Sequence, residues 1–173
     1  LLPAALSTQQ PPEAGASAFA ACHESARLLG CRDGAAALCL FTRDGGREVW
    51  LANAGDCRAV LCPAEPGAPP QRLTVDHRAE EPSEQARIEA AGGLVEFGQL
   101  EGMLALSRGL GGCDLCASGF SQAPHVAGPL QMAEGDAVLL ASDGVFDVLS
   151  DAEAAELVRA ALRGGRDLGA TCR

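Results

Sequence analysis

The stretch that decides the fold is AVLLASDGVFD, residues 137–147. Its apolar run 138–141 predicts the interior of a buried strand, and Gly144 allows a sharp turn directly after that strand. Asp143 and Asp147 lie on either side of the turn, so both carboxylates can point to one place. Hard cations such as Mg2+ and Mn2+ prefer clustered carboxylate oxygens. The segment therefore predicts either a metal site at a strand end or helix N-caps at these two aspartates, and both interpretations stay open at this point.

A second carboxylate occupies a similar position earlier in the chain. Asp56 follows Gly55 in NAGDCRAV, residues 53–60, where a hairpin joins two expected strands. Carboxylates at the ends of neighbouring strands can converge on one point. Asp56 is therefore a candidate third ligand beside Asp143 and Asp147. The alternative is ordinary turn chemistry, because Asp after Gly is a frequent turn residue.

Length and composition limit the classes of protein that fit. The chain has 173 residues, of which 47% are hydrophobic, enough for one domain with a sizeable core. Its formal net charge is -10 and its pI is about 4.6, whereas a nucleic-acid partner requires a basic patch. Apolar runs are too short for a membrane span, and residues 1–6 lack the basic flank of a signal peptide. We expect no nucleic-acid partner, no membrane association and a monomer.

The eight cysteines are too sparse for a disulfide-stapled domain, and several stand inside apolar runs. Most are expected to be small core residues in a reducing compartment, cytoplasmic or nuclear. Cys113 and Cys116 differ, because their two-residue spacer suits zinc or redox chemistry. A zinc or redox site at these cysteines needs further thiolate or histidine ligands. His77 and His125 are candidates, although neither belongs to a metal-binding motif. His23, on an expected helix, is predicted to lie at the surface.

Hydrophobic periodicity and turn residues predict an α+β protein. Tight turns between the first three strands favour an antiparallel meander, and helices near both ends argue against βαβ winding. Ser83 is expected to cap the second helix. The expected elements are a linker or loop at 7–15, helices at 16–29, 83–91 and 152–162, strands at 35–42, 48–54, 57–62, 94–97, 103–106 and 138–141, a turn at 98–102 and a long loop at 109–128.

Five motifs then follow one another in a recognisable order. They are NAGDCRAV at 53–60, LTVDHR at 73–78, Glu84 with Arg87-Ile88 before Ala91-Gly92-Gly93, LALSRGLG at 104–111 and ASDGVFDVLS at 141–150. Their order and spacing resemble the type 2C metal-dependent serine/threonine protein phosphatases over residues 34–162. The resemblance implies two packed antiparallel β-sheets flanked by helices. It divides the chain into a linker or ragged start at 1–15 and a partial phosphatase-like domain at 16–173.

The resemblance also implies roles for individual residues. Asp143 matches an aspartate that ligates one ion of a central Mg2+ or Mn2+ pair and reaches a third metal, while Asp56 and Asp147 match ligands of that third metal. The implied reaction is direct attack of a metal-activated water on phosphoserine or phosphothreonine of a phosphoprotein, without a phosphoenzyme. Ser107 and Arg108 match a segment that affects substrate access. For Arg108, a structural ion pair is the favoured alternative to direct phosphate contact.

Other parts of the family pattern are absent from the sequence. In this family an Asp-Gly-His-Gly segment carries a metal-bridging aspartate and a histidine that acts as an acid. Residues 1–15 contain neither that segment nor the family's phosphate-binding arginine, so no catalytic residue is assigned. A last Asp-Asn pair would lie beyond Arg173, which leaves one of three carboxylates expected around the central metal pair. Cys57 stands in place of the usual Ser, and Gly112 in place of the usual Asp, with Asp114 displaced by two positions.

Two explanations of this partial pattern compete. If the chain is a fragment of a longer reading frame, its parent is expected to be an active phosphatase; we favour this explanation because the chain opens on Leu1 and not on Met. If the chain is complete, it is expected to be a catalytically inactive phosphatase-like module that binds a phosphoprotein or regulates a partner.

Overall fold

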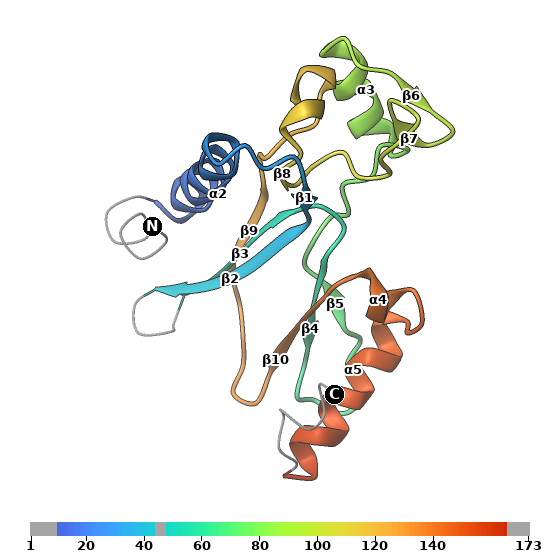
Figure 1. The fold of residues 1–173 in the computed structure, drawn as a ribbon. Helices are drawn as coiled ribbons and strands as arrows, with labels where there is room; N and C mark the ends of the chain where they lie inside the picture. The colour runs from blue at the N-terminus through green and yellow to red at the C-terminus, as the bar shows by residue number, and fades with distance from the viewer. Residues whose placement is uncertain (1–9, 44–47, 166–173) are drawn as a thin grey trace.

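Two antiparallel sheets lie face to face between two helices (Figure 1). The structure is a computed structural model that describes residues 10–43 and 48–165. One sheet has the strand order β2 (Ala37–Arg43), β3 (Glu48–Ala54), β9 (His125–Leu130). The other has the order β10 (Ala137–Ala141), β4 (Arg58–Cys62), β5 (Gln71–Arg72). Helix α2 (Pro11–Leu28) covers the first sheet, and α5 (Asp151–Arg163) covers the second.

The apolar pattern of the strands explains these layers. Successive side chains of a strand point to opposite faces, and both faces of β4 are apolar. Ala59 and Leu61 face the space between the sheets, where they pack with Leu51 and Leu73. Val60 and Cys62 face α5 and contact Ala155. On the far side of the sandwich, Phe19 of α2 packs against Phe41, Ala52 and Ala54.

A smaller lobe lies at one end of the sandwich (Figure 1). Its core is formed by Ala79, Ile88, Leu100 and Phe120. A short pairing of two strands lies between this lobe and the first sheet, and the single-turn helix α4 follows β10. The elements concerned are α3 (Pro82–Ala90), β6 (Val95–Glu96), β7 (Gln99–Leu100), the 3-10 helix η2 (Cys113–Ser118), β1 (Gly34–Ala35) paired with β8 (Leu110–Gly111), and α4 (Asp143–Phe146).

The expected α+β class, antiparallel pairing and flanking helices are confirmed, but the meander is wrong at its third strand. β4 does not pair with β3; it pairs with β10 on one side and β5 on the other. The physical reason is that residues 59–62 are apolar on both faces of the strand and need a sheet on one face and a helix on the other. Gly55, with φ of 120°, occupies a conformation that L side chains rarely adopt, where the chain passes from one sheet to the next.

Several expected boundaries are also wrong. The loop expected at 7–15 is helical from Pro11 onward, because proline is tolerated in a first helical turn; residues 7–9 lie outside the described residues. The loop expected at 109–128 contains β8, η2 and the start of β9, whose pairing with β3 has no local signal. Ser83 does not cap α3, because Glu81 holds the N-cap position.

The strand expected at 103–106 is wrong in position. The hairpin pairs β6 with β7 instead, so β7 falls within the expected turn. Phe97 and Gly98 both have positive φ, at 53° and 75°, which suits the two-residue turn between those strands. Residues 103–106 make isolated bridges, Leu100 with Leu104 and Arg78 with Leu106.

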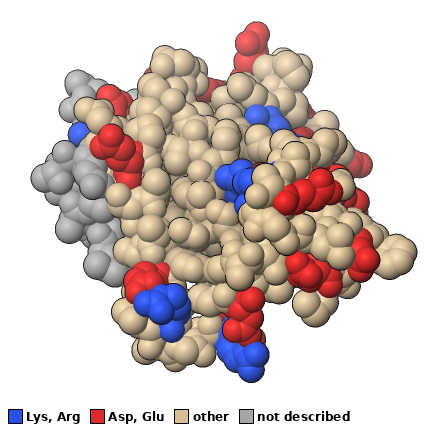
Figure 2. Space-filling view, turned by 90° about the horizontal axis from the view of Figure 1, so that it is seen from above, with Lys and Arg blue, Asp and Glu red and all other residues tan. Residues whose placement is uncertain are grey.

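Acidic and basic side chains are interspersed on the face seen in Figure 2, where blue arginine surfaces are small and several lie beside red carboxylates. Within residues 10–43 and 48–165, no helix combines the length and apolarity that crossing a membrane requires.

Candidate metal site at the paired ends of β4 and β10

The pairing of β4 with β10 brings two of the predicted aspartates together. Ala141 is the register partner of Arg58. Asp143 lies two residues after Ala141, and Asp56 lies two residues before Arg58, so both aspartates follow the same end of the paired strands. Burial raises the pKa of Asp56, the charge of Arg78 lowers it and the charge of Asp143 raises it, with a net upward direction. The two carboxylates are therefore close enough to repel each other.

Gly55 fixes the turn that presents Asp56. A Cβ at position 55 would lie 2.5 Å from the Cβ of Ala36, so a side chain does not fit there. The carbonyl oxygen of Gly55 accepts hydrogen bonds from Asn53 Nδ2 at 3.1 Å and from the backbone N of His77 at 3.0 Å. Burial, followed by the charge of Arg108, lowers the pKa of His77 to about 4. The Nδ1 of this ring accepts from the backbone N of Gly55 at 3.3 Å, so a buried neutral imidazole and a buried amide hold the turn in place.

Asp56 already has one cationic partner. Arg78 Nη2 donates to its Oδ2 at 2.9 Å, and the Asp56 side chain is only 12% exposed. A carboxylate can accept several hydrogen bonds or ligate a cation through its other oxygen. The ion pair therefore orients Asp56 and leaves an oxygen for a second cation.

Asp143 and Asp147 are not helix N-caps, so that interpretation is wrong. Ser142 holds the N-cap position of α4 without a side-chain cap hydrogen bond, and Asp143 is the first helical residue. The backbone N of Asp147 donates to the carbonyl oxygen of Asp143 at 2.7 Å, which places their side chains one helical turn apart on the same face. Both residues are exposed. The next helix, α5, is capped instead by Ser150.

The fit of these residues to a metal ion is partial. Within the described ranges, no three Asp, Glu, His or Cys side chains gather closely enough to hold a metal ion. Asp147 therefore does not complete a three-ligand group with Asp56 and Asp143 in this conformation. What the structure provides is a pair of hard oxygen donors that repel each other, and a divalent cation between them would relieve that repulsion.

A network of ion pairs fixes the elements that carry the two aspartates. Arg58 donates to Asp151 Oδ1 at 2.8 Å and to Asp76 Oδ2 at 3.3 Å. Its guanidinium carbon also lies 4.6 Å from the centre of the Phe146 ring, a cation–π distance. Arg58 thus connects β4 to α4 and α5, and with them the turn at Asp143.

Ser107 and Arg108 belong to a buried network around Glu84. Glu84 accepts from Ser107 Oγ at 2.7 Å, from Arg108 Nη2 at 2.5 Å and from Arg87 Nη2 at 2.8 Å. Burial raises the pKa of Glu84, but the hydrogen bonds from Arg108, Arg87 and Ser107 outweigh it and lower the pKa to about 2. The structural ion pair expected for Arg108 is confirmed, and its effect on substrate access stays a prediction. Residue patterns alone did not reveal Glu84 as the centre of this network, because Ser107 and Arg108 are distant from it in sequence.

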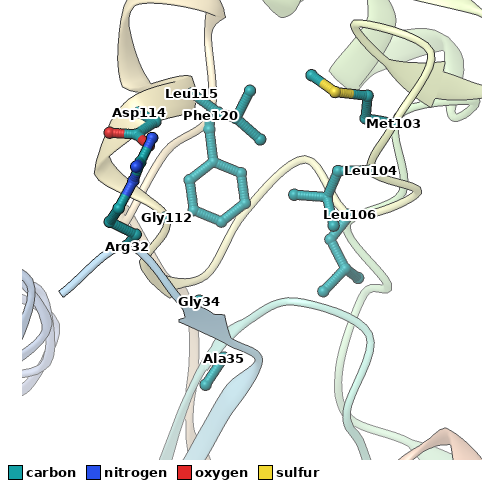
Figure 3. Close-up of a pocket in the computed structure, with 10 residues that line it drawn as sticks. All are labelled: Arg32, Gly34, Ala35, Met103, Leu104, Leu106, Gly112, Asp114, Leu115 and Phe120. Carbon is teal, nitrogen blue, oxygen red and sulfur yellow. The ribbon is translucent and has the colours of Figure 1, made fainter.

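Two further features lie away from this site. A cavity of about 420 Å3 between β1 and the small lobe is lined mainly by apolar side chains such as Leu106 and Phe120, and Arg32 and Asp114 point toward each other beside it, 2.7 Å apart (Figure 3). Cys113 and Cys116 lie against His23, not against His77 or His125. The surface position predicted for His23 is wrong, because its exposed fraction is 9%.

Comparison with known proteins places this geometry in a family. The sequence matches the family described as Protein phosphatase 2C over residues 10–172. It is 43% identical over 115 residues to "Protein phosphatase 2C 56" of Arabidopsis thaliana, which covers 65% of this chain and 26% of the relative. It is 43% identical over 136 residues to "Probable protein phosphatase 1N" of Mus musculus, which covers 73% of this chain and 32% of the relative. The chain thus spans about a quarter to a third of the length of these curated relatives.

Solved structures agree with this result. A serine-threonine phosphatase 2C from Toxoplasma gondii matches with a TM-score of 0.75 at 25% identity, covering 90% of this chain and 56% of that one. A sex determining protein of C. elegans matches with a TM-score of 0.76 at 22% identity, covering 92% and 41%, and supports the fold alone. With the sequence motifs, the packed sheets and the paired aspartates in place, the chain belongs to the protein phosphatase 2C family.

Proposed function

We propose that this chain forms part of the catalytic domain of a longer metal-dependent protein phosphatase that hydrolyses phosphoserine and phosphothreonine in proteins. The observation that carries the proposal is the juxtaposition of Asp56 and Asp143 at the paired ends of β4 and β10. Two carboxylates that repel each other are costly unless a cation joins them. Family membership adds the reaction class.

The proposed ligands of Mg2+ or Mn2+ are Asp143, Asp56 and Asp147. An ion of this kind supplies charge neutralisation for a phosphate and lowers the pKa of a bound water. Asp143 contributes negative charge at the end of β10, and Arg78 orients Asp56 through their ion pair. Asp147 lies one helical turn beyond Asp143, on the same side of α4. The Glu84 network holds Ser107 and Arg108 in place, and the backbone of Arg108 lies close to Gly55, the residue before Asp56.

Phosphate release from a phosphothreonine peptide, measured with Mn2+ present, tests the proposal. The protein to use is a longer chain that includes this segment together with the Asp-Gly-His-Gly and Asp-Asn segments. We expect Asp143→Asn to lower kcat by more than the roughly 10–100-fold typical of residues that only support a metal ligand. Glu134→Gln, an exposed carboxylate before β10, is the matched control and should leave kcat unchanged. Equal activity in both variants would contradict the proposed role of Asp143.

A second candidate function is an inactive phosphatase-like module that binds a phosphoprotein or regulates a partner. The observation in its favour is that the described residues contain no three-ligand group. In a longer chain that lacked both missing segments, phosphopeptide binding without phosphate release would support this alternative.

The 173-residue chain by itself is predicted not to hydrolyse a generic aryl phosphate with Mn2+, because it carries only one of three carboxylates expected around the central metal pair. Absorbance of the released phenolate measures this directly. Robust turnover that Asp143→Ala abolishes would contradict the account of the missing ligands.

A further inference from the structure

Cys113 and Cys116 form a thiol pair against one buried imidazole. They stand at the first and fourth positions of η2, and in a 3-10 helix residues three apart lie directly above one another, about 6 Å apart along the axis. That spacing lies inside the roughly 4.4–6.8 Å range of Cα separations that disulfides span. His23 Nε2 lies 3.9 Å from the Cys113 sulfur and 3.7 Å from the Cys116 sulfur. All seven described cysteines are free thiols.

Among the described residues, the Nδ1 of His23 is buried without a hydrogen-bond partner, and its Nε2 faces the two sulfurs. A buried polar ring that satisfies only its thiol contacts costs free energy. The ring is therefore better placed to exchange a proton with the thiols than to stabilise α2.

The two thiols are not equivalent. Burial raises the pKa of Cys116, and the neighbouring Cys113 raises it further. We therefore assign the second step to Cys116, the thiol whose ionisation its surroundings oppose.

We propose that Cys113 and Cys116 form a reversible redox site that closes to a disulfide by exchange with a low-molecular-weight disulfide such as oxidised glutathione. The Cys113 thiolate attacks one sulfur of glutathione disulfide, which forms a mixed disulfide and releases one glutathione thiolate. Cys116 then gives its proton to His23 and attacks the Cys113 sulfur, which closes the intramolecular disulfide and releases the second glutathione thiolate. The two protons from the cysteines end on the two glutathione thiolates, and two cysteine thiols are oxidised as one disulfide is reduced.

The position of the pair connects its redox state to the rest of the fold. η2 begins after Gly112, whose backbone N donates to the carbonyl oxygen of Asp33 at 3.0 Å. Asp114 and Leu115, between the two cysteines, line the cavity of Figure 3. Closing the disulfide removes both thiol contacts of His23 and constrains the wall of that cavity. The inference rests on the thiol geometry and does not depend on the proposed phosphatase activity.

The test is peptide mass spectrometry on the 173-residue chain after incubation with defined ratios of oxidised and reduced glutathione. Remaining thiols are trapped with an alkylating reagent. We expect the peptide with Cys113 and Cys116 to lose two hydrogens and to resist alkylation, and a dithiol reductant to reverse the change. Cys31 is exposed, and its thiol contacts the carbonyl oxygen of Asp33 at 3.8 Å, so we expect it to form only a mixed disulfide with glutathione.

Three variants make the assignment specific. Cys116→Ser should stop at a mixed disulfide on Cys113, and His23→Gln should slow closure several-fold and move its pH dependence upward. Cys31→Ser is the matched control and should leave closure unchanged. Failure of the wild-type pair to close before the other cysteines oxidise would overturn the proposal. A second outcome would overturn it as well. If the chain is first stripped with a chelator and then given one equivalent of Zn2+, protection of both thiols from alkylation would indicate a metal site.

Discussion

Glu84 connects distant segments of the small lobe through a buried charge. Its side chain is 6% exposed and carries ion pairs to Arg87 and Arg108 as well as the hydrogen bond from Ser107. A buried charge is tolerated only when it is paired and hydrogen-bonded. Glu84 therefore holds the Ser107–Arg108 segment beside α3 through charge.

Glu84→Gln is expected to lower the free energy of unfolding by about 2–3 kcal/mol at pH 7. That is below the roughly 3–5 kcal/mol of fully buried pairs, because both arginines remain partly exposed. The folded-state pKa of Glu84 is about 2 against an ordinary value of 4.5, so its contribution is complete above pH 4.5 and is lost as the pH falls through about 2. Urea denaturation at pH 7 and pH 3 measures both effects. Exposed Glu89→Gln on the same helix is the control, and a loss of equal size there would contradict the role of Glu84.

His77 is predicted to stay neutral well below its ordinary pKa. Burial and the charge of Arg108 lower its pKa from 6.5 to about 4, so on acidification the unfolded chain takes up the proton first. The resulting stability is complete above pH 6.5 and is lost as the pH falls through about 4. A ring-proton NMR titration reports the protonation of His77 directly, and His77→Gln assigns the resonance. A midpoint near 6.5 would show that the imidazole does not hold the Gly55 turn in the way described.

At the scale of elements, α5 has the clearest local signal and the most direct connection to the site. Ser150 Oγ accepts from the backbone N of Glu153 at 3.2 Å, while Glu153 Oε2 accepts from the backbone N of Ser150 at 2.9 Å. This capping box begins the helix three residues after Asp147. Its apolar side, Ala155 and Val158, packs on β4 and β10, so the cap helps to fix the turn that carries the aspartates.

Ser150→Ala is expected to lower the free energy of unfolding by about 1 kcal/mol, the usual cost of losing an N-cap side chain. Chemical denaturation followed by circular dichroism measures the change. Ser17→Ala, at an exposed position within α2, is the comparison and should change stability by less than about 0.5 kcal/mol. If both substitutions had the same effect, the capping box would have no special role.

The elements also show what sequence patterns could predict. Helix α5, strands β2 to β4 and strand β10 follow from apolar periodicity and turn residues, because each signal is local. The sheet to which β4 belongs and the existence of β9 could not be predicted, because strand partners lie far apart in the chain. The start of α2 at Pro11 was hidden by a Pro-rich composition that is typical of loops but is also compatible with a first helical turn.

At the scale of the whole molecule, the sandwich brings together residues that are distant in sequence. The motifs predicted that Asp56 and Asp143 meet, and the β4–β10 register supports it. The same motifs predicted Asp147 as a ligand, a role that stays a prediction. The Cys113–His23 contact had no sequence signal at all, because 90 residues separate the two side chains.

The central claim is that Asp56 and Asp143 form a metal-binding pair inherited from a phosphatase site. The measurement that tests it most directly is the titration of the 173-residue chain with Mn2+, followed by the electron paramagnetic resonance signal of free Mn2+. We predict weak binding that Asp56→Ala and Asp143→Ala abolish, that Asp147→Ala reduces, and that Glu134→Ala leaves unchanged. Identical Mn2+ affinity in the wild type and all four variants would contradict the claim and leave these aspartates as turn residues.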